Sequence, residues 1–133
     1  MGLNAQDLSK HQWKERLVLV IAKNKDNKNF QKQLAELQNH QNGLKDRKLV
    51  IYRILPKKYS IGFREENRNN SNELYQNYKD EERDFSVILI GLDGGEKLIQ
   101  NEMLSAEKLF NTIDSMPMRQ SVKTDNFNNR IKT

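Results

Sequence analysis

The stretch from Phe85 to Gln100 restricts the possible fold more than any other part of the sequence. Its first half contains an unbroken aliphatic run, Val87 to Ile90, and Asp93-Gly94-Gly95 then supplies residues that tolerate a positive φ. The chain can therefore reverse into a second strand, Glu96 to Gln100, and the pattern predicts a β-hairpin. Because the first strand shows no polar alternation, we expect it to be covered on both faces, whereas the charged second strand is typical of a sheet edge.

Two further strands and a helix are predicted before this hairpin. The runs Leu17 to Ala22 and Lys48 to Leu55 are rich in β-branched residues and too short for independent helices. Between them, Asn27 or Asn29 can N-cap a helix that Gly43 is placed to end. Its apolar residues recur at helical spacing and are Phe30, Leu34, Leu37 and Leu44. A strand, a helix and a strand in this order predict a parallel pair with a right-handed crossover.

Two shorter helices are predicted on either side of the hairpin. The first can begin at Ser71 or Asn72, and the second follows Ser105 as its N-cap and is ended by Pro117. Their apolar faces are formed by Leu74, Tyr75 and Tyr78 in the first helix and by Leu109, Phe110 and Ile113 in the second. The segment Pro56 to Asn70 has no regular pattern and is expected to be a long loop.

These elements predict one α/β domain with a central mixed four-stranded sheet and helices on both faces. The sheet consists of the two parallel strands and the hairpin, and the order of elements is that of a thioredoxin-like domain. Residues 1–7 are expected to be a residual signal or expression segment, residues 8–119 the domain, and residues 120–133 a flexible, polar and basic tail.

Charge and composition exclude several classes of function. The formal net charge is +5, and the segment from Met118 to Thr133 contributes +3 of it, from Arg119, Lys123, Arg130 and Lys132 against Asp125. The domain itself is therefore only weakly basic, which argues against sequence-specific nucleic-acid binding. The chain has no cysteine, so disulfides, thiol catalysis and cysteine metal sites are excluded. No apolar run approaches the roughly 18 to 20 residues that span a bilayer, and no transmembrane segment is predicted.

The remaining titratable residues predict no catalytic, cofactor-binding or metal-binding set. His11 and His40 are the only histidines and belong to different predicted elements. Carboxylates occur as adjacent pairs, Glu65-Glu66 and Glu81-Glu82, and adjacent residues do not face each other. We therefore expect solvated side chains rather than an acid–base pair or a metal site.

Four segments of the sequence carry a resemblance to a known family. They are Trp13 to Val20, Arg47 to Val50, Ile90 to Leu98, and Ile113 to Arg119, the last reading Ile-Asp-Ser-Met-Pro-Met-Arg. Together they resemble a thioredoxin/peroxiredoxin-like domain of unknown function that is shared by bacterial exported proteins and vertebrate sushi-repeat and extracellular matrix proteins. The resemblance implies a thioredoxin-like fold and often an exported setting, and it implies no activity. The resemblance also implies a structural role for the residues of the family motif. They are Trp13, Arg16, Asp93, Gly94, Gly95, Asp114, Pro117 and Arg119.

Basic residues in two segments predict a site for an anion or an acidic partner. One set follows the first strand at a predicted helix N-terminus, where free backbone amides favour an anion. The other lies in the expected loop over residues 56–70, which starts at the same end of the sheet. The candidates are Lys23, Lys25 and Lys28 in the first set and Lys57, Lys58, Arg64 and Arg68 in the second.

The leading interpretation is a non-catalytic exported binding module, periplasmic or extracellular, whose partner is a protein or a polyanionic glycan. We expect it to use no cofactor and to be a monomer or a weak dimer. The start Leu3-Asn4-Ala5-Gln6 resembles the end of a secretory signal peptide that has been removed. The alternative is an oxidoreductase-like enzyme or redox subunit that uses a borrowed cofactor or a partner thiol.

Overall fold

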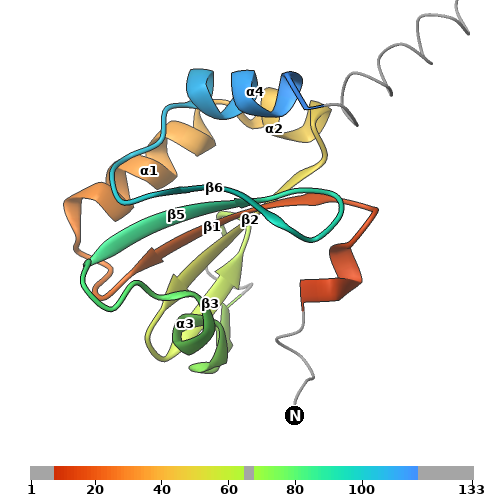
Figure 1. Ribbon diagram of the computed structural model, residues 1–133. Coiled ribbons are helices and arrows are strands. Elements are labelled where there is room, and N and C mark those ends of the chain that lie inside the picture. Colours follow the sequence, from red (N-terminus) through yellow and green to blue (C-terminus); the bar gives the residue numbers. More distant parts are fainter. Residues whose placement is uncertain (1–7, 65–67, 117–133) are drawn as a thin grey trace, which may run out of the picture.

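A six-stranded mixed sheet lies at the centre of the protein, with helices on both of its faces (Figure 1). The structure is a computed structural model that describes residues 8–64 and 68–116. The strand order is β4-β3-β2-β1-β5-β6. The strands are β1 (Arg16–Ala22), β2 (Leu49–Leu55), β3 (Lys58–Ile61), β4 (Arg68–Asn70), β5 (Phe85–Ile90) and β6 (Glu96–Gln100). The helices are α1 (Lys28–Gln38), α2 (Gln41–Asp46), α3 (Glu73–Tyr78) and α4 (Ala106–Asp114), and a 3-10 turn, η1 (Leu8–His11), precedes β1.

Strand β1 holds the two halves of the sheet together. It runs parallel to β2, with Arg16 opposite Leu49, and antiparallel to β5, with Leu17 opposite Ile90. Every residue of β1 and of β5 is buried. The predicted hairpin is confirmed, because β5 pairs antiparallel with β6, and β6 is an edge strand. Its turn contains Gly94 at a φ of 85°, a conformation that favours glycine.

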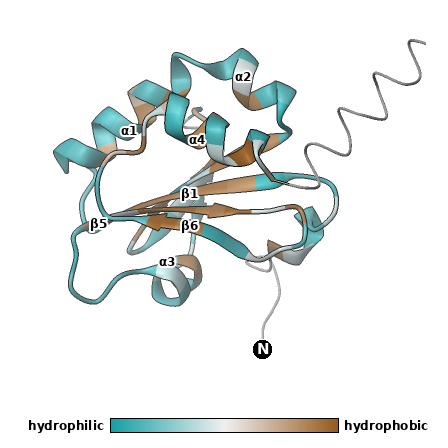
Figure 2. Cartoon of the chain, turned by 45° about the horizontal axis from the view of Figure 1, so that its top comes forward, coloured by the Kyte–Doolittle hydropathy of each residue, from teal (hydrophilic) through white to brown (hydrophobic). Residues whose placement is uncertain are grey.

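Side chains on the two faces of the sheet form two separate hydrophobic clusters. On β1, Val18 and Val20 face α1, α2 and α4, whereas Leu17, Leu19 and Ile21 face α3 and η1. Figure 2 shows the strands coloured as hydrophobic between helices whose outer surfaces are hydrophilic. The prediction that helices cover both faces is therefore confirmed.

The prediction of a four-stranded sheet is wrong, because the expected loop contributes two more strands. Lys58–Ile61 forms β3, which pairs antiparallel with β2, and Arg68–Asn70 forms β4, which pairs antiparallel with β3. Both strands are short, and β4 consists entirely of exposed polar residues. Backbone pairing with the neighbouring strand therefore outweighs the low β propensity of asparagine.

The predicted helix over residues 28–44 is also divided in two. Helix α1 ends at Gln38, and α2 begins at Gln41. Gly43 lies inside α2 and ends neither helix. A Cβ at this position would come within 2.5 Å of Phe110 Cε2, so glycine allows α2 to pack closely against α4.

Two predicted helix caps are confirmed at α1 and α4. Asn27 Oδ1 accepts a hydrogen bond from the Phe30 amide at 3.0 Å, and Ser105 Oγ accepts one from the Lys108 amide at 3.1 Å. Helix α3 begins after Asn72 as predicted, with Ser71 Oγ accepting from the Glu73 amide. Helix α4 ends at Asp114, and Pro117 lies outside the described residues.

One polar side chain is completely buried in the layer between α1 and the segment before α4. Gln33 Nε2 donates to the Leu104 carbonyl at 2.8 Å, and Gln33 Oε1 accepts from the Leu104 amide at 2.6 Å. The backbone N–H and C=O of one buried residue are thus both paired by a single side chain, which fixes the path of the chain from β6 to α4.

Candidate functional site

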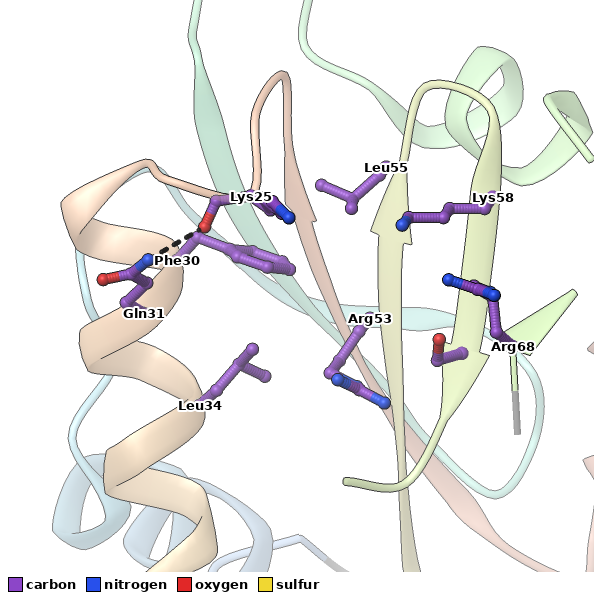
Figure 3. A pocket seen from close by; sticks show the side chains of 9 residues that line it. Lys25, Phe30, Gln31, Leu34, Arg53, Leu55, Lys58 and Arg68 are labelled. Carbon is purple, nitrogen blue, oxygen red and sulfur yellow. Dashed lines mark hydrogen bonds between the residues drawn. The ribbon is translucent and has the colours of Figure 1, made fainter. Parts of the chain in front are cut away.

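A groove of about 340 Å³ lies between α1 and the strands β2, β3 and β4 (Figure 3). Phe30 and Leu34 come from α1, and the opposite side is formed by side chains from β2, β3 and β4. The complete lining is Lys25, Phe30, Gln31, Leu34, Arg53, Leu55, Lys58, Ser60 and Arg68.

Four of the lining residues carry a positive charge and none carries a negative charge. Lys25 lies in the loop between β1 and α1, and the other three cations, Arg53, Lys58 and Arg68, come from β2, β3 and β4. Within the described residues, no carboxylate lies within ion-pair distance of Lys25, Lys58 or Arg68. Three cations without a carboxylate partner among the described residues attract an anion into the groove.

Arg53 is held in place by the backbone beside it. Its Nε donates to the Gly62 carbonyl at 2.9 Å, and its Nη2 donates to the Arg64 carbonyl at 2.8 Å. The guanidinium is therefore oriented before any ligand arrives, which lowers the entropy cost of binding. Arg53 was missed by the sequence analysis, although a charged residue within an otherwise apolar strand is a recognisable signal.

The N-terminal part of α1 shapes the other side of the groove. The cap at Asn27 sets the start of the helix, and Phe30 and Leu34 then follow one turn apart on the face toward the sheet. Gln31 Nε2 donates to the Lys25 carbonyl at 3.2 Å, which ties the preceding loop to the helix (Figure 3). Together with Leu55, Phe30 and Leu34 give the groove an apolar portion beside its cationic one.

The structure brings three of the seven predicted basic residues together in the groove, namely Lys25, Lys58 and Arg68. Lys23 instead pairs with Asp84, with 3.3 Å between Nζ and Oδ1. Lys28, Lys57 and Arg64 are exposed and are not part of the lining.

The motif residues gather at the other end of β1. The Trp13 amide donates to the Leu92 carbonyl at 2.6 Å, and Arg16 Nη1 donates to the Arg47 carbonyl at 3.0 Å. Arg47 in turn donates from Nε and Nη2 to the two carboxylate oxygens of Asp114, at 3.0 and 2.8 Å. These bonds link the four separate segments that carry the resemblance. Pro117 and Arg119 lie outside the described residues.

The turn of the hairpin belongs to the same end. Lys97 Nζ donates to Asp93 Oδ2 and the Gly95 amide donates to Asp93 Oδ1, and these two bonds lower the pKa of the Asp93 carboxyl. Gln12 Nε2 donates to the Asp93 carbonyl at 2.9 Å, so the segment before β1 is fastened to this turn. The contacts of Asp93 with Lys97, Gly95 and Gln12 therefore stabilise the hairpin turn.

Comparison with known proteins gives one match. Residues 7–121 match the model of a family described as a domain of unknown function, DUF4174. The chain belongs to the DUF4174 family. No curated protein and no solved structure matches the chain. The resemblance found in the sequence is thus confirmed as membership of a family of unknown function.

A second cluster of titratable residues in the DUF4174 domain lies under η1. His11 Nε2 and Tyr52 Oη are 2.7 Å apart in a hydrogen bond, and His11 Nδ1 is hydrogen-bonded to Glu15. The Tyr52 ring stacks on Tyr59, with 5.8 Å between the ring centroids. Because Tyr52 is only 2% exposed, a substrate cannot reach its hydroxyl, and the cluster fastens η1 to the sheet.

Metal-binding groups and membrane-spanning helices are absent from the part of the chain that the structure describes. Within residues 8–64 and 68–116, no three acidic or histidine side chains are grouped closely enough to hold a metal ion. None of the helices in these ranges has the length and apolar character needed to cross a membrane.

The free energy of unfolding is expected to fall at alkaline pH because of Tyr52. Burial raises its pKa from 10.0 to about 12, and Tyr59 and Glu15 add to the shift. Below pH 10 the hydroxyl is protonated in both the folded and unfolded states, so its protonation does not reduce the free energy of unfolding. Between pH 10 and pH 12 only the unfolded state loses the proton, and about 3 kcal/mol of stability is lost.

Urea unfolding followed across this pH range measures the effect. The Tyr52→Phe variant has no proton to lose at this position and serves as the control. An equally large loss of stability in Tyr52→Phe would assign the effect to other groups.

Proposed function

We propose that this DUF4174 domain is a non-catalytic, thioredoxin-like module that binds a polyanionic glycan in the groove between α1 and β2–β4. The observation that carries the proposal is the set of four cations, Lys25, Arg53, Lys58 and Arg68, without a carboxylate among the lining residues. Such a set attracts negative charge, and the groove holds no described acid–base pair with which to catalyse a reaction on it.

The arrangement of the elements supports the thioredoxin-like part of the proposal. The unit β1-α1-β2 has parallel strands, and β5 and β6 form an antiparallel hairpin beside β1. Helix α3 packs on one face, whereas α1 and α4 pack on the other. In this description β3 and β4 extend the sheet beyond β2 and form one side of the groove.

The amino-acid sequence excludes the thiol chemistry that active thioredoxin-like proteins carry out. The loop that leads into α1, Lys23 to Asn27, contains no cysteine, serine or threonine. A proline shapes the redox site before the corresponding strand of such proteins, and Asp84 stands there in this chain. No observation favours the alternative of a redox subunit with a borrowed cofactor.

A glycan fits the groove better than an acidic peptide does. A peptide presents carboxylates singly on flexible side chains, whereas a sulfated or uronic sugar presents several charges on one rigid ring. The apolar portion made by Phe30, Leu34 and Leu55 suits the face of such a ring. An exported setting would give access to such glycans, and it stays a prediction.

The test is binding of the full chain to a heparin-type polymer as a function of salt. Changing Lys25, Lys58 and Arg68 together to glutamine is expected to weaken binding at least about tenfold at low salt. The slope of log affinity against log salt should fall by up to about 3, roughly one for each contact removed. Isothermal titration calorimetry at several salt concentrations measures both quantities.

Two variants with the same change of charge serve as controls. One replaces Lys10, Lys14 and Lys45, which are exposed and lie outside the groove. The other replaces Lys123, Arg130 and Lys132 in the basic C-terminal segment. Equal weakening in all three variants would mean that net charge alone binds the polymer, and loss in the C-terminal variant alone would assign binding to that segment. Binding of an acidic peptide in preference to the glycan would identify a protein partner instead.

A further inference from the structure

Most of the groove lining divides into two chemically different portions that face each other, apart from Lys25 in the loop before α1 and Leu55 on β2. In Figure 3 the side chains of Phe30 and Leu34 project from α1, and the side chains of Lys58 and Arg68 project toward them from β3 and β4. Ser60 adds a hydroxyl to the strand side. A ligand that satisfies both portions must have an apolar surface and an anionic group on opposite sides.

The number of positive charges indicates how many negative charges the ligand carries. Lys25, Lys58 and Arg68, which have no carboxylate within ion-pair distance among the described residues, share a groove of about 340 Å³ and repel one another across it. A single carboxylate neutralises one of these charges, whereas a dianion neutralises two. At the short distances within such a groove, each neutralised charge adds substantially to the affinity, because salt screens charges effectively only beyond about 10 Å.

The volume limits the size of the part that enters. Ligand pockets in proteins range from about 300 to 1,000 Å³, so this groove lies at the lower end of that range. The enclosed part of a ligand is therefore small, about the size of a sugar ring, and a longer stretch of polymer must remain outside.

From these three observations we infer that the groove recognises a single sugar-sized ring that carries at least two negative charges on one side and an apolar face on the other. The inference rests on the proposed function and narrows it from polyanions in general to a compact dianionic unit. The strand side, with Lys58, Arg68 and the pre-oriented Arg53, binds the dianionic group. The α1 side, with Phe30 and Leu34, contacts the ring.

Three small probes separate the requirements for ring and charge. Glucose 6-phosphate has a ring and is largely a dianion at about pH 7.5, inorganic phosphate has the charge without the ring, and glucuronate has the ring with one charge. We expect the full-length protein to bind glucose 6-phosphate at least about tenfold more tightly than either of the others at low salt. NMR titration of the backbone amides measures the affinities and shows whether the shifts lie at the groove.

The Leu34→Gln variant tests the apolar portion directly. Leu34 is half-buried, so the change alters the wall of the groove without placing a polar group in the centre of the core. The ratio between the affinities for glucose 6-phosphate and inorganic phosphate should fall toward one in this variant. A control, Leu98→Gln, alters a half-buried leucine on β6, outside the groove, and should leave the ratio unchanged.

The outcomes distinguish this inference from the proposed function. Equal affinity for phosphate and glucose 6-phosphate overturns the requirement for a ring, and equal affinity for glucuronate overturns the requirement for two charges. If the polymer binds through Lys25, Lys58 and Arg68 while none of the small probes binds, the inference is wrong and the proposed function stands. If neither the polymer nor the probes bind at the groove, both are wrong.

Discussion

Replacing Gln33 with leucine is expected to lower the free energy of unfolding by about 2 to 6 kcal/mol. Leucine fills much of the same space but can neither donate to the Leu104 carbonyl nor accept from the Leu104 amide, which Gln33 pairs at 2.8 and 2.6 Å. Both backbone groups are buried, and each unpaired buried group costs about 1 to 3 kcal/mol. The loss should appear as a lower urea midpoint with an unchanged m-value.

A matched control is available on the same helix. Gln38 is exposed on α1, so Gln38→Leu should change stability by less than about 0.5 kcal/mol. The Gln33→Glu variant adds a second comparison, because an ionised carboxylate can accept from the Leu104 amide but cannot donate to the carbonyl. If Gln33→Leu is as stable as the unaltered protein, the paired hydrogen bonds make no net contribution to stability.

The Leu89→Ala variant is expected to lose about 2 to 4 kcal/mol of stability. Leu89 is completely buried in β5, opposite Val18 of β1, and belongs to the cluster beneath α1, α2 and α4. Its removal costs the burial of the side chain and leaves a cavity that the sheet cannot close. In contrast, Ile99 on the edge strand β6 is 56% exposed, so Ile99→Ala should cost far less.

Urea unfolding of both variants gives the comparison. Similar losses for Leu89→Ala and Ile99→Ala would contradict the assignment of β5 to the centre of the core and β6 to its edge.

Long apolar runs made the central strands predictable from the sequence. The runs at Leu17–Ala22 and 85–90 have no polar alternation, and such a pattern over six residues suits a strand that is buried on both faces. The two side-chain caps, Asn27 and Ser105, were equally predictable because a cap depends only on residues within one turn.

Strands β3 and β4 could not be predicted because they become strands by backbone pairing with a neighbouring strand rather than through their own residue pattern. Arg68–Asn70 has no apolar residue and becomes a strand by pairing with β3. The break between α1 and α2 likewise depends on packing, since Gly43 must lie against Phe110, 67 residues further along the chain.

The candidate site was predicted only in part for the same reason. Lys25, Lys58 and Arg68 belong to the two segments that were expected to be close, and they do line one groove. Arg53 was marked by its charge within an apolar strand, but its hydrogen bonds to Gly62 and Arg64 depend on the chain that follows β2 and could not be read from that signal. Lys23 was misleading, since its ion pair with Asp84 joins two loops that are far apart in the sequence.

The motif residues and the groove occupy opposite ends of β1, and this separation has a consequence for how the groove can be altered. Trp13, Arg16, Arg47 and Asp114 hold the frame together through bonds that involve none of the residues lining the groove. Substitution of the cations Lys25, Lys58 and Arg68 therefore leaves these bonds intact, whereas Phe30 also belongs to the hydrophobic core. The charge of the groove can therefore be changed by substitution while the bonds that join the four motif segments stay in place.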